Sequence, residues 1–127
     1  MTCILIDDEP LALKVLEKYA TKVNDLQIEG IFTNPFLAHQ HLLQHKVDLL
    51  FLDIQMPDIN GLQFFRQLEH PPMVIFSTAF RDYAVEGFEL AAIDYLVKPY
   101  EFDRFQQAVH KAKEYFDYQQ LTANSDT

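Results

Sequence analysis

Five residues with carboxylate, hydroxyl or ammonium side chains each stand at the end of a short apolar run of the sequence. In a sheet of parallel strands the carboxyl ends lie together, so side chains at these ends would meet in one crevice. Three carboxylates in one crevice repel one another, by roughly 4 kcal/mol for two unit charges about 4 Å apart at an effective dielectric constant of about 20. An all-oxygen set favours a hard cation such as Mg²⁺, and a neighbouring lysine suits a phosphoryl group. The five residues are Asp7, Asp8, Asp53, Thr78 and Lys98.

A carboxylate in such a site can itself be the nucleophile and become an aspartyl phosphate. The structural alternative is that each aspartate is a helix cap or a loop residue, which is common for any one of them. The joint presence of three aspartates with Thr78 and Lys98 favours a phosphoryl-transfer site over that alternative.

The elements that would position these side chains follow from hydrophobic periodicity. Residues 48–53 are apolar on both faces, as is typical of a central parallel strand. Proline at the first helical position marks two helix starts, at Pro10 and, after the N-cap Asn34, at Pro35. The expected strands are residues 3–6, 27–33, 48–53, 73–79 and 93–97, and the expected helices are residues 10–23, 35–45, 61–68, 82–91 and 102–116.

Five strands interleaved with five helices predict an α/β fold, a doubly wound parallel sheet covered on both faces. The chain has 127 residues, which is enough for one domain with a sizeable core. We expect that domain to comprise residues 1–118. Residues 119–127 are polar and small, and we expect them to be a frayed tail or the start of a linker.

Composition excludes several classes of protein. The net charge of -9 and the pI near 4.8 argue against direct binding of nucleic acid or of an anionic membrane. The single cysteine, Cys3, cannot form an internal disulfide, and no apolar run is long enough to span a bilayer, so we expect a cytoplasmic protein. The chain has only three glycines and contains neither a P-loop nor a dinucleotide fingerprint.

Four segments together resemble the receiver domain of two-component response regulators, over residues 2–118. The segments are residues 6–10 (IDDEP), 52–61 (LDIQMPDING), 77–79 (STA) and 94–99 (DYLVKP). The resemblance implies a flavodoxin-like sheet with strand order 2-1-3-4-5. It also implies a signalling domain that assists its own phosphorylation and dephosphorylation, and not an enzyme acting on a separate substrate.

The resemblance assigns roles to the acidic residues and the lysine. Asp53 would be the phosphoacceptor and would receive its phosphoryl group from a sensor histidine kinase. Asp8 and Asp53 would bind Mg²⁺ directly, together with the backbone carbonyl of Gln55, and Asp7 would act through bound water. Lys98 would pair with the phosphoryl oxygens.

The resemblance also implies a conformational switch. The Thr78 hydroxyl would move toward the phosphate, and Tyr95 would rotate inward in response. The face formed by residues 82–91, 93–97 and 102–116 would change, and it is where a phosphorylation-linked homodimer would form. Gln55 and Phe80 would tune hydrolysis, and we expect the bulky Phe80 to shield the phosphate and give a long-lived phosphoryl state.

Residues 8–12 and 80–96 resemble, in particular, receivers attached to LytTR-type DNA-binding domains. No such output domain lies within this sequence. We interpret the chain as a receiver separated from an output domain that regulates transcription, with a single-domain regulator as the alternative.

Three other functions are open to a chain of this kind. A receiver-like module could dock partners without phosphorylation, although all five site residues are present. A haloacid dehalogenase-type hydrolase would need a D-x-D arrangement, but Gln55 stands two residues after Asp53. A flavodoxin-like electron carrier would need a phosphate-binding loop after the first strand, where residues 7–9 are acidic and would repel the flavin phosphate.

His41 and His45 are four residues apart on a predicted helix, with His39 close by, and could in principle hold a metal ion. We favour a solvated helix face, because the sequence shows no third ligand.

Overall fold

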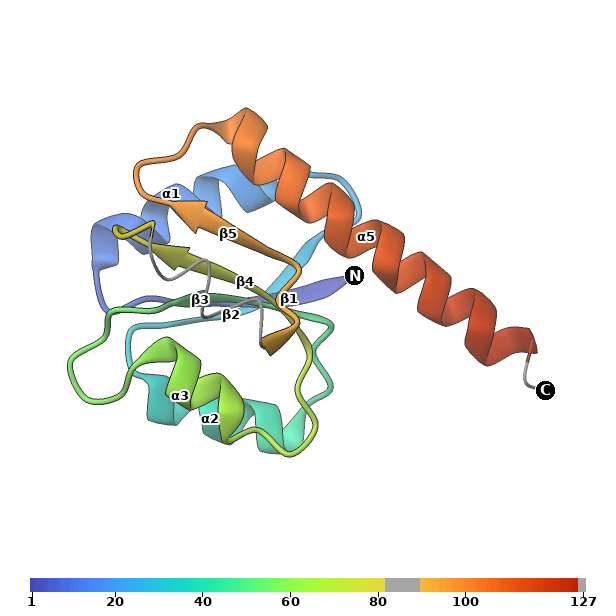
Figure 1. Cartoon of the computed structure of the whole chain (residues 1–127), viewed down its shortest axis with the longest axis horizontal. Helices are drawn as coiled ribbons and strands as arrows, with labels where there is room; N and C mark the ends of the chain where they lie inside the picture. Colours follow the sequence, from blue (N-terminus) through green and yellow to red (C-terminus); the bar gives the residue numbers. More distant parts are fainter. Residues whose placement is uncertain (82–89, 126–127) are drawn as a thin grey trace.

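The core of the molecule is a five-stranded parallel sheet (Figure 1). The computed structural model describes residues 1–81 and 90–125. The strand order is β2-β1-β3-β4-β5, which confirms the predicted doubly wound sheet. The strands are β1 (Thr2–Ile6), β2 (Gln27–Phe32), β3 (Leu49–Asp53), β4 (Met73–Thr78) and β5 (Asp94–Val97).

Helices cover both faces of the sheet: α1 and α5 lie on one side, and α2 and α3 on the other (Figure 1). The predicted proline starts are confirmed, and the Asn34 side chain accepts a hydrogen bond of 2.8 Å from the backbone N–H of Phe36. The expected helix over residues 82–91 falls mainly on residues 82–89, outside the described part of the chain. The four described helices are α1 (Pro10–Thr21), α2 (Pro35–Gln44), α3 (Gly61–Arg66) and α5 (Phe102–Ser125).

Helix α5 is longer than expected. It continues to Ser125, so residues 119–125, which we expect to be a frayed tail or the start of a linker, are helical. The reason is that residues 102–125 contain no glycine or proline to end the helix. Its last turns extend beyond the sheet (Figure 1), where Tyr118 and Leu121 are exposed. Among the described residues, no helix is both long and apolar enough to cross a membrane.

Strand β3 lies at the centre of the sheet, and all five of its residues are buried. This confirms the interpretation of its uninterrupted apolar sequence. On the face of α1 and α5, the ring of Phe51 stacks on that of Phe105 with centroids 5.2 Å apart. Burial of each large apolar side chain contributes about 1.5–3 kcal/mol, so this dry centre holds the carboxyl end of β3 in a fixed place.

The start of α3 packs directly against the end of β3. The N–H of Gly61 donates a 2.8 Å hydrogen bond to the carbonyl of Ile54, and a β-carbon at residue 61 would overlap the carbonyl oxygen of Asp53. The Asn60 side chain caps the helix by accepting a 2.7 Å hydrogen bond from the N–H of Leu62. Only glycine permits this close approach, and it fixes the backbone that carries Asp53.

The substitution Gly61→Ala should therefore lower stability by about 1–3 kcal/mol, because the added methyl group must displace the Asp53 backbone. It should also weaken Mg²⁺ binding, since Asp53 would move. Gly30→Ala is the matched control: its methyl group would meet the side chains of Phe32 and Ile4 and not the Asp53 backbone. Thermal unfolding and Mg²⁺ titration of both variants test this, and equal losses of Mg²⁺ affinity would contradict it.

Candidate functional site

The carboxyl ends of four neighbouring strands place the predicted site residues together. Asp53 and Thr78 are the last residues of β3 and β4, and Asp7 and Lys98 directly follow β1 and β5. Backbone hydrogen bonds continue the ladder at both outer positions, from Asp7 N–H to the carbonyl of Phe32 (3.1 Å) and from Lys98 N–H to that of Thr78 (2.8 Å). The sheet therefore fixes the backbone beneath each of these side chains.

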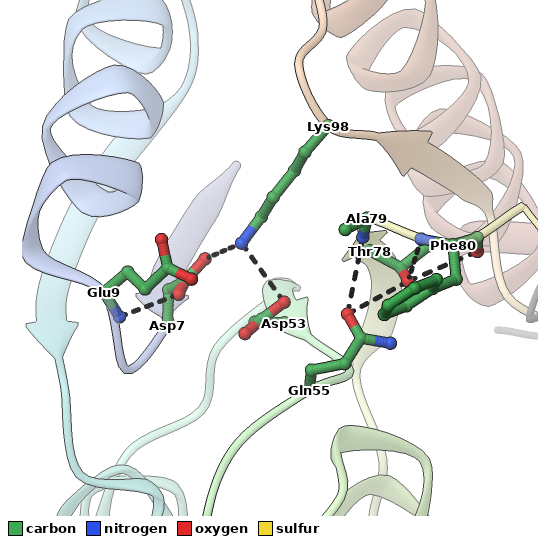
Figure 2. A network of polar contacts seen from close by, with 8 residues as sticks. All are labelled: Asp7, Glu9, Asp53, Gln55, Thr78, Ala79, Phe80 and Lys98. Carbon is green, nitrogen blue, oxygen red and sulfur yellow. Dashed lines mark hydrogen bonds and ion pairs between the residues drawn. The ribbon is translucent and has the colours of Figure 1, made fainter.

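Lys98 bridges two buried carboxylates (Figure 2). Its ammonium Nζ lies 2.8 Å from Asp7 Oδ2 and 3.2 Å from Asp53 Oδ1. Asp7 is fully buried and Asp53 is 2% exposed. The other oxygen of Asp7 accepts a 3.0 Å hydrogen bond from the N–H of Glu9. One ammonium group thus faces two buried carboxylates, so its single positive charge does not balance their two negative charges.

The electrostatics of the pair follow from this imbalance. Burial, together with the charge of Asp7, raises the pKa of Asp53 to about 7, although Lys98 opposes the shift. Burial alone would lower the pKa of Lys98, but its contacts with Asp7 and Asp53 outweigh that effect and raise it. The two carboxylates thus stabilise the ammonium form of Lys98, whereas burial beside Asp7 disfavours the charged form of Asp53.

The acidic group has the composition of a magnesium site. Asp7, Asp8 and Asp53 each offer one oxygen, and the three oxygens lie within 4.8 Å of one another. One oxygen of Asp8 is buried and has no hydrogen-bond partner among the described residues. An unsatisfied buried carboxylate oxygen beside two others fits a hard cation with oxygen ligands, so the residues present suit Mg²⁺.

The Thr78 hydroxyl lies on the other side of the site (Figure 2). It donates to Gln55 Oε1 at 3.0 Å, lies 3.3 Å from the carbonyl of Phe80, and accepts a 3.0 Å hydrogen bond from the N–H of Phe80. The hydroxyl has one hydrogen and two possible acceptors, so it can redirect that hydrogen without moving the chain. Both predicted hydrolysis-tuning positions, Gln55 and Phe80, thus contact Thr78, and the Phe80 side chain is 57% exposed.

Tyr95 is not part of the acidic cluster. It lies in β5, directly opposite Phe76 of β4, and the two rings stack with centroids 5.4 Å apart. Its hydroxyl oxygen is buried. The structure therefore places Tyr95 on the strand that leads to Lys98, half-buried against the ring of Phe76.

A link between β5 and α5 escapes sequence analysis. Arg104 donates two hydrogen bonds to the Asp94 carboxylate (2.8 and 2.7 Å) and one to the carbonyl of Tyr95 (3.1 Å), and Lys111 lies 3.1 Å from the same carboxylate. Burial raises the pKa of Asp94, but the hydrogen bonds from Arg104, Tyr95 N–H and Lys111 outweigh it and hold that pKa below its usual value. The spacing of residues along the sequence does not predict this pairing, because the pairing joins the start of a strand to a helix that follows a loop.

The fold and this acidic crevice are those of a response regulator receiver domain, and the chain belongs to that family, whose model matches residues 3–110. It is 40% identical over 113 residues to the transcriptional regulatory protein BtsR of Salmonella typhi. These aligned residues make up 87% of this chain and 47% of that protein. It is 38% identical over 116 residues to the sensory transduction protein LytR of Staphylococcus haemolyticus, with 89% and 45% covered. Both relatives are LytTR-type response regulators, which confirms the predicted resemblance.

The chain spans about half the length of these curated relatives. Among solved structures it is similar to the response regulatory domain of protein mrkE from Klebsiella pneumoniae, at 33% identity and a TM-score of 0.84. That similarity covers 93% of this chain and 99% of the other. The match therefore extends over almost the whole of a separate receiver domain.

The pKa of Asp53 leads to a pH-dependent stability. The folded protein holds a proton on Asp53 up to about pH 7, whereas the unfolded chain releases it near pH 3.8, so stability should fall as the pH rises between these values. Asp53→Asn removes this loss. The free energy of unfolding of the variant should therefore rise with pH relative to that of the natural protein. At pH 8 it should be higher by more than about 1 kcal/mol.

Urea unfolding at pH 5, 6, 7 and 8 with a metal chelator measures this difference in the free energy of unfolding. Asp58→Asn, which removes a carboxylate from an exposed loop position, is the control for loss of one negative charge. If the free energies of unfolding of Asp53→Asn and the natural protein differ by the same amount from pH 5 to pH 8, the pKa of Asp53 is not raised in the folded protein.

Proposed function

We propose that this domain is a phosphorylation-dependent signalling switch that accepts a phosphoryl group on Asp53 from a sensor histidine kinase. The observation that carries the proposal is the buried pair Asp7 and Asp53 joined by Lys98, next to the unsatisfied oxygen of Asp8. Such a site has an excess of negative charge that a cation would balance. It also has an ammonium group placed beside the nucleophilic carboxylate.

Mg²⁺ would be held by Asp8, Asp53 and the backbone carbonyl of Gln55. Asp7 would act through water, because its two oxygens already accept hydrogen bonds from Lys98 and from the N–H of Glu9. When bound, the ion supplies positive charge that offsets the oxygens of the acceptor and of the incoming phosphoryl group.

The chemistry of the chain's own residues follows from their placement. Asp53 must lose its proton, and one of its oxygens then attacks the phosphorus of a phosphohistidine. An O–P bond forms, the P–N bond breaks, and the imidazole of the kinase leaves with the electron pair. Lys98 holds the Asp53 carboxylate in place at 3.2 Å and stays near enough to pair with a phosphoryl oxygen. Positioning and charge stabilisation are the main demands of such a transfer.

The switch would begin at Thr78. A phosphoryl group adds about -1.5 to -2 charges and three strong acceptor oxygens. The Thr78 hydroxyl, now 3.0 Å from Gln55 Oε1, would turn to a phosphoryl oxygen and release that contact. Tyr95 would then rotate inward and alter the face of β5 and α5. A change from 1:99 to 99:1 between two conformations requires about 5.5 kcal/mol of differential interaction.

We infer the partners of the switch from its relatives. One of them is named as a transcriptional regulatory protein and is about twice as long as this chain, so an output domain that binds DNA would receive the signal. The altered face would also support a phosphorylation-linked homodimer. Part of that face, residues 82–89, lies outside the described residues. A single sedimenting species of monomer mass in both phosphorylation states would remove the homodimer from the account.

Incubation with acetyl phosphate and Mg²⁺ should add one phosphoryl group to the protein, visible in its intact mass. The adduct should be absent with a metal chelator, because the acidic group would repel the donor, and absent from Asp53→Asn. No adduct on the natural protein, together with no binding of beryllofluoride, would instead favour a docking module that works without phosphorylation. An equal adduct on Asp53→Asn would contradict the assignment of the acceptor.

Phe80→Glu should shorten the life of the phosphoryl group, because it replaces an apolar ring near Thr78 and Gln55 with a carboxylate that attracts water. Tyr118→Glu makes the same kind of change at an exposed residue of α5, far along the chain from the site, and should leave the lifetime unchanged. Decay of the adduct after removal of acetyl phosphate measures both. Equal decay of the two variants would contradict the shielding role of Phe80.

A further inference from the structure

One side-chain oxygen of Gln55 accepts from two neighbouring donors at the end of β4. Thr78 Oγ1 donates to Gln55 Oε1 at 3.0 Å, and the backbone N–H of Ala79 donates to the same oxygen at 3.4 Å (Figure 2). A backbone N–H group only donates, so the amide oxygen of Gln55, and not the amide nitrogen, faces these two groups. A single neutral acceptor therefore occupies both donors.

The Thr78 hydroxyl is fully engaged in this arrangement. Its oxygen accepts a 3.0 Å hydrogen bond from the N–H of Phe80, and the hydroxyl has one hydrogen to donate. Gln55 Oε1 lies 3.0 Å from Thr78 Oγ1, closer than the carbonyl of Phe80 at 3.3 Å. Thr78 is buried, so a new acceptor for its hydrogen must displace a protein acceptor and not water.

The backbone of β3 and β4 brings Gln55 and Thr78 together. Gln55 is the second residue after Asp53, which ends β3. Between them, the N–H of Ile54 donates a 2.9 Å hydrogen bond to the carbonyl of Ser77, the residue before Thr78. The ladder of the sheet thus continues one residue past β3, and it fixes the chain on both sides of the contact between Gln55 and Thr78.

The amide nitrogen of Gln55 is not satisfied. Nε2 is buried and has no hydrogen-bond partner among the described residues. Most buried polar groups in proteins have a partner, because a group without one loses its hydrogen bonds to water. The side chain is therefore held by its oxygen alone, and the cost at the nitrogen makes this contact easier to displace than that of a fully bonded amide.

We propose that the Gln55 side chain is a competing acceptor, which holds the Thr78 hydroxyl and the Ala79 N–H until a phosphoryl oxygen displaces it. This inference rests on the proposed phosphorylation of Asp53. A phosphoryl oxygen is charged and forms stronger hydrogen bonds than a neutral amide oxygen, so it would win both donors. Gln55 would then stabilise the unphosphorylated conformation, an effect that precedes phosphorylation and is separate from any effect on hydrolysis.

The substitution Gln55→Met tests the proposal, because methionine has nearly the same length but no amide oxygen. In amide NMR spectra of the full chain without ligand, the Ala79 proton signal should move upfield as its acceptor is lost. Titration with beryllofluoride in excess Mg²⁺ should show about fivefold tighter binding, the factor that one net hydrogen bond contributes. Gln40→Met is the matched control at an exposed position of α2, and it should change neither result.

A double-mutant cycle separates competition for the hydroxyl from a general change in packing. Thr78→Val keeps the shape of the side chain but removes the hydroxyl, so in that background Gln55→Met should improve beryllofluoride binding by a smaller factor.

The proposal is overturned if Gln55→Met leaves the Ala79 signal and the affinity of the natural protein unchanged. It is also overturned if the gain in affinity is equally large with Thr78→Val or with Gln40→Met. These results leave the proposed function intact, since the natural protein still binds the mimic. Failure of the natural protein and of every variant to bind beryllofluoride would overturn the proposed function and this inference together.

Discussion

The shared position of Lys98 between Asp7 and Asp53 is the interaction on which the rest of the site depends. A single ammonium cannot neutralise both buried carboxylates and the neighbouring Asp8, so these residues carry an excess of negative charge. Burial, which raises the cost of that excess charge, also strengthens any interaction that relieves it. A cation and a phosphoryl group are complementary to what the site lacks: positive charge for the carboxylates, and acceptor oxygens for Lys98 and Thr78.

The fold maintains this imbalance by surrounding the strand ends with apolar layers. Strand β3 is buried along its whole length, and the close approach of Gly61 leaves the backbone of Asp53 no room to relax. Asp7 and Asp8 after β1, Thr78 at the end of β4 and Lys98 after β5 come to the same edge. The sheet fixes each of these backbones, so the charged side chains start close together, whereas the Thr78 hydroxyl has two acceptors between which its hydrogen can turn.

The sequence predicts much of this arrangement, because parallel strands have a simple rule for where their ends meet. The strand order, the proline starts and the gathering of Asp7, Asp53, Thr78 and Lys98 all follow that rule or the family resemblance. Contacts between distant segments do not follow it. Two examples are the hydrogen bonds from Arg104 to Asp94 and the approach of Glu29 to His41. Both depend on how the helices pack on the sheet. Helix α5 is longer than the expected 102–116, because residues 117–125 are polar but contain no glycine or proline that would end a helix.

A crystal structure with Mg²⁺ and beryllofluoride, a stable mimic of a phosphoryl group, would show whether Asp53 is the phosphoacceptor and which residues bind the ion. We expect beryllium bonded to a carboxylate oxygen of Asp53, magnesium in contact with Asp8 and Asp53, and Lys98 beside a fluoride. We also expect the Thr78 hydroxyl to have left Gln55. Beryllofluoride away from Asp53, or magnesium bound without Asp8, would contradict the account.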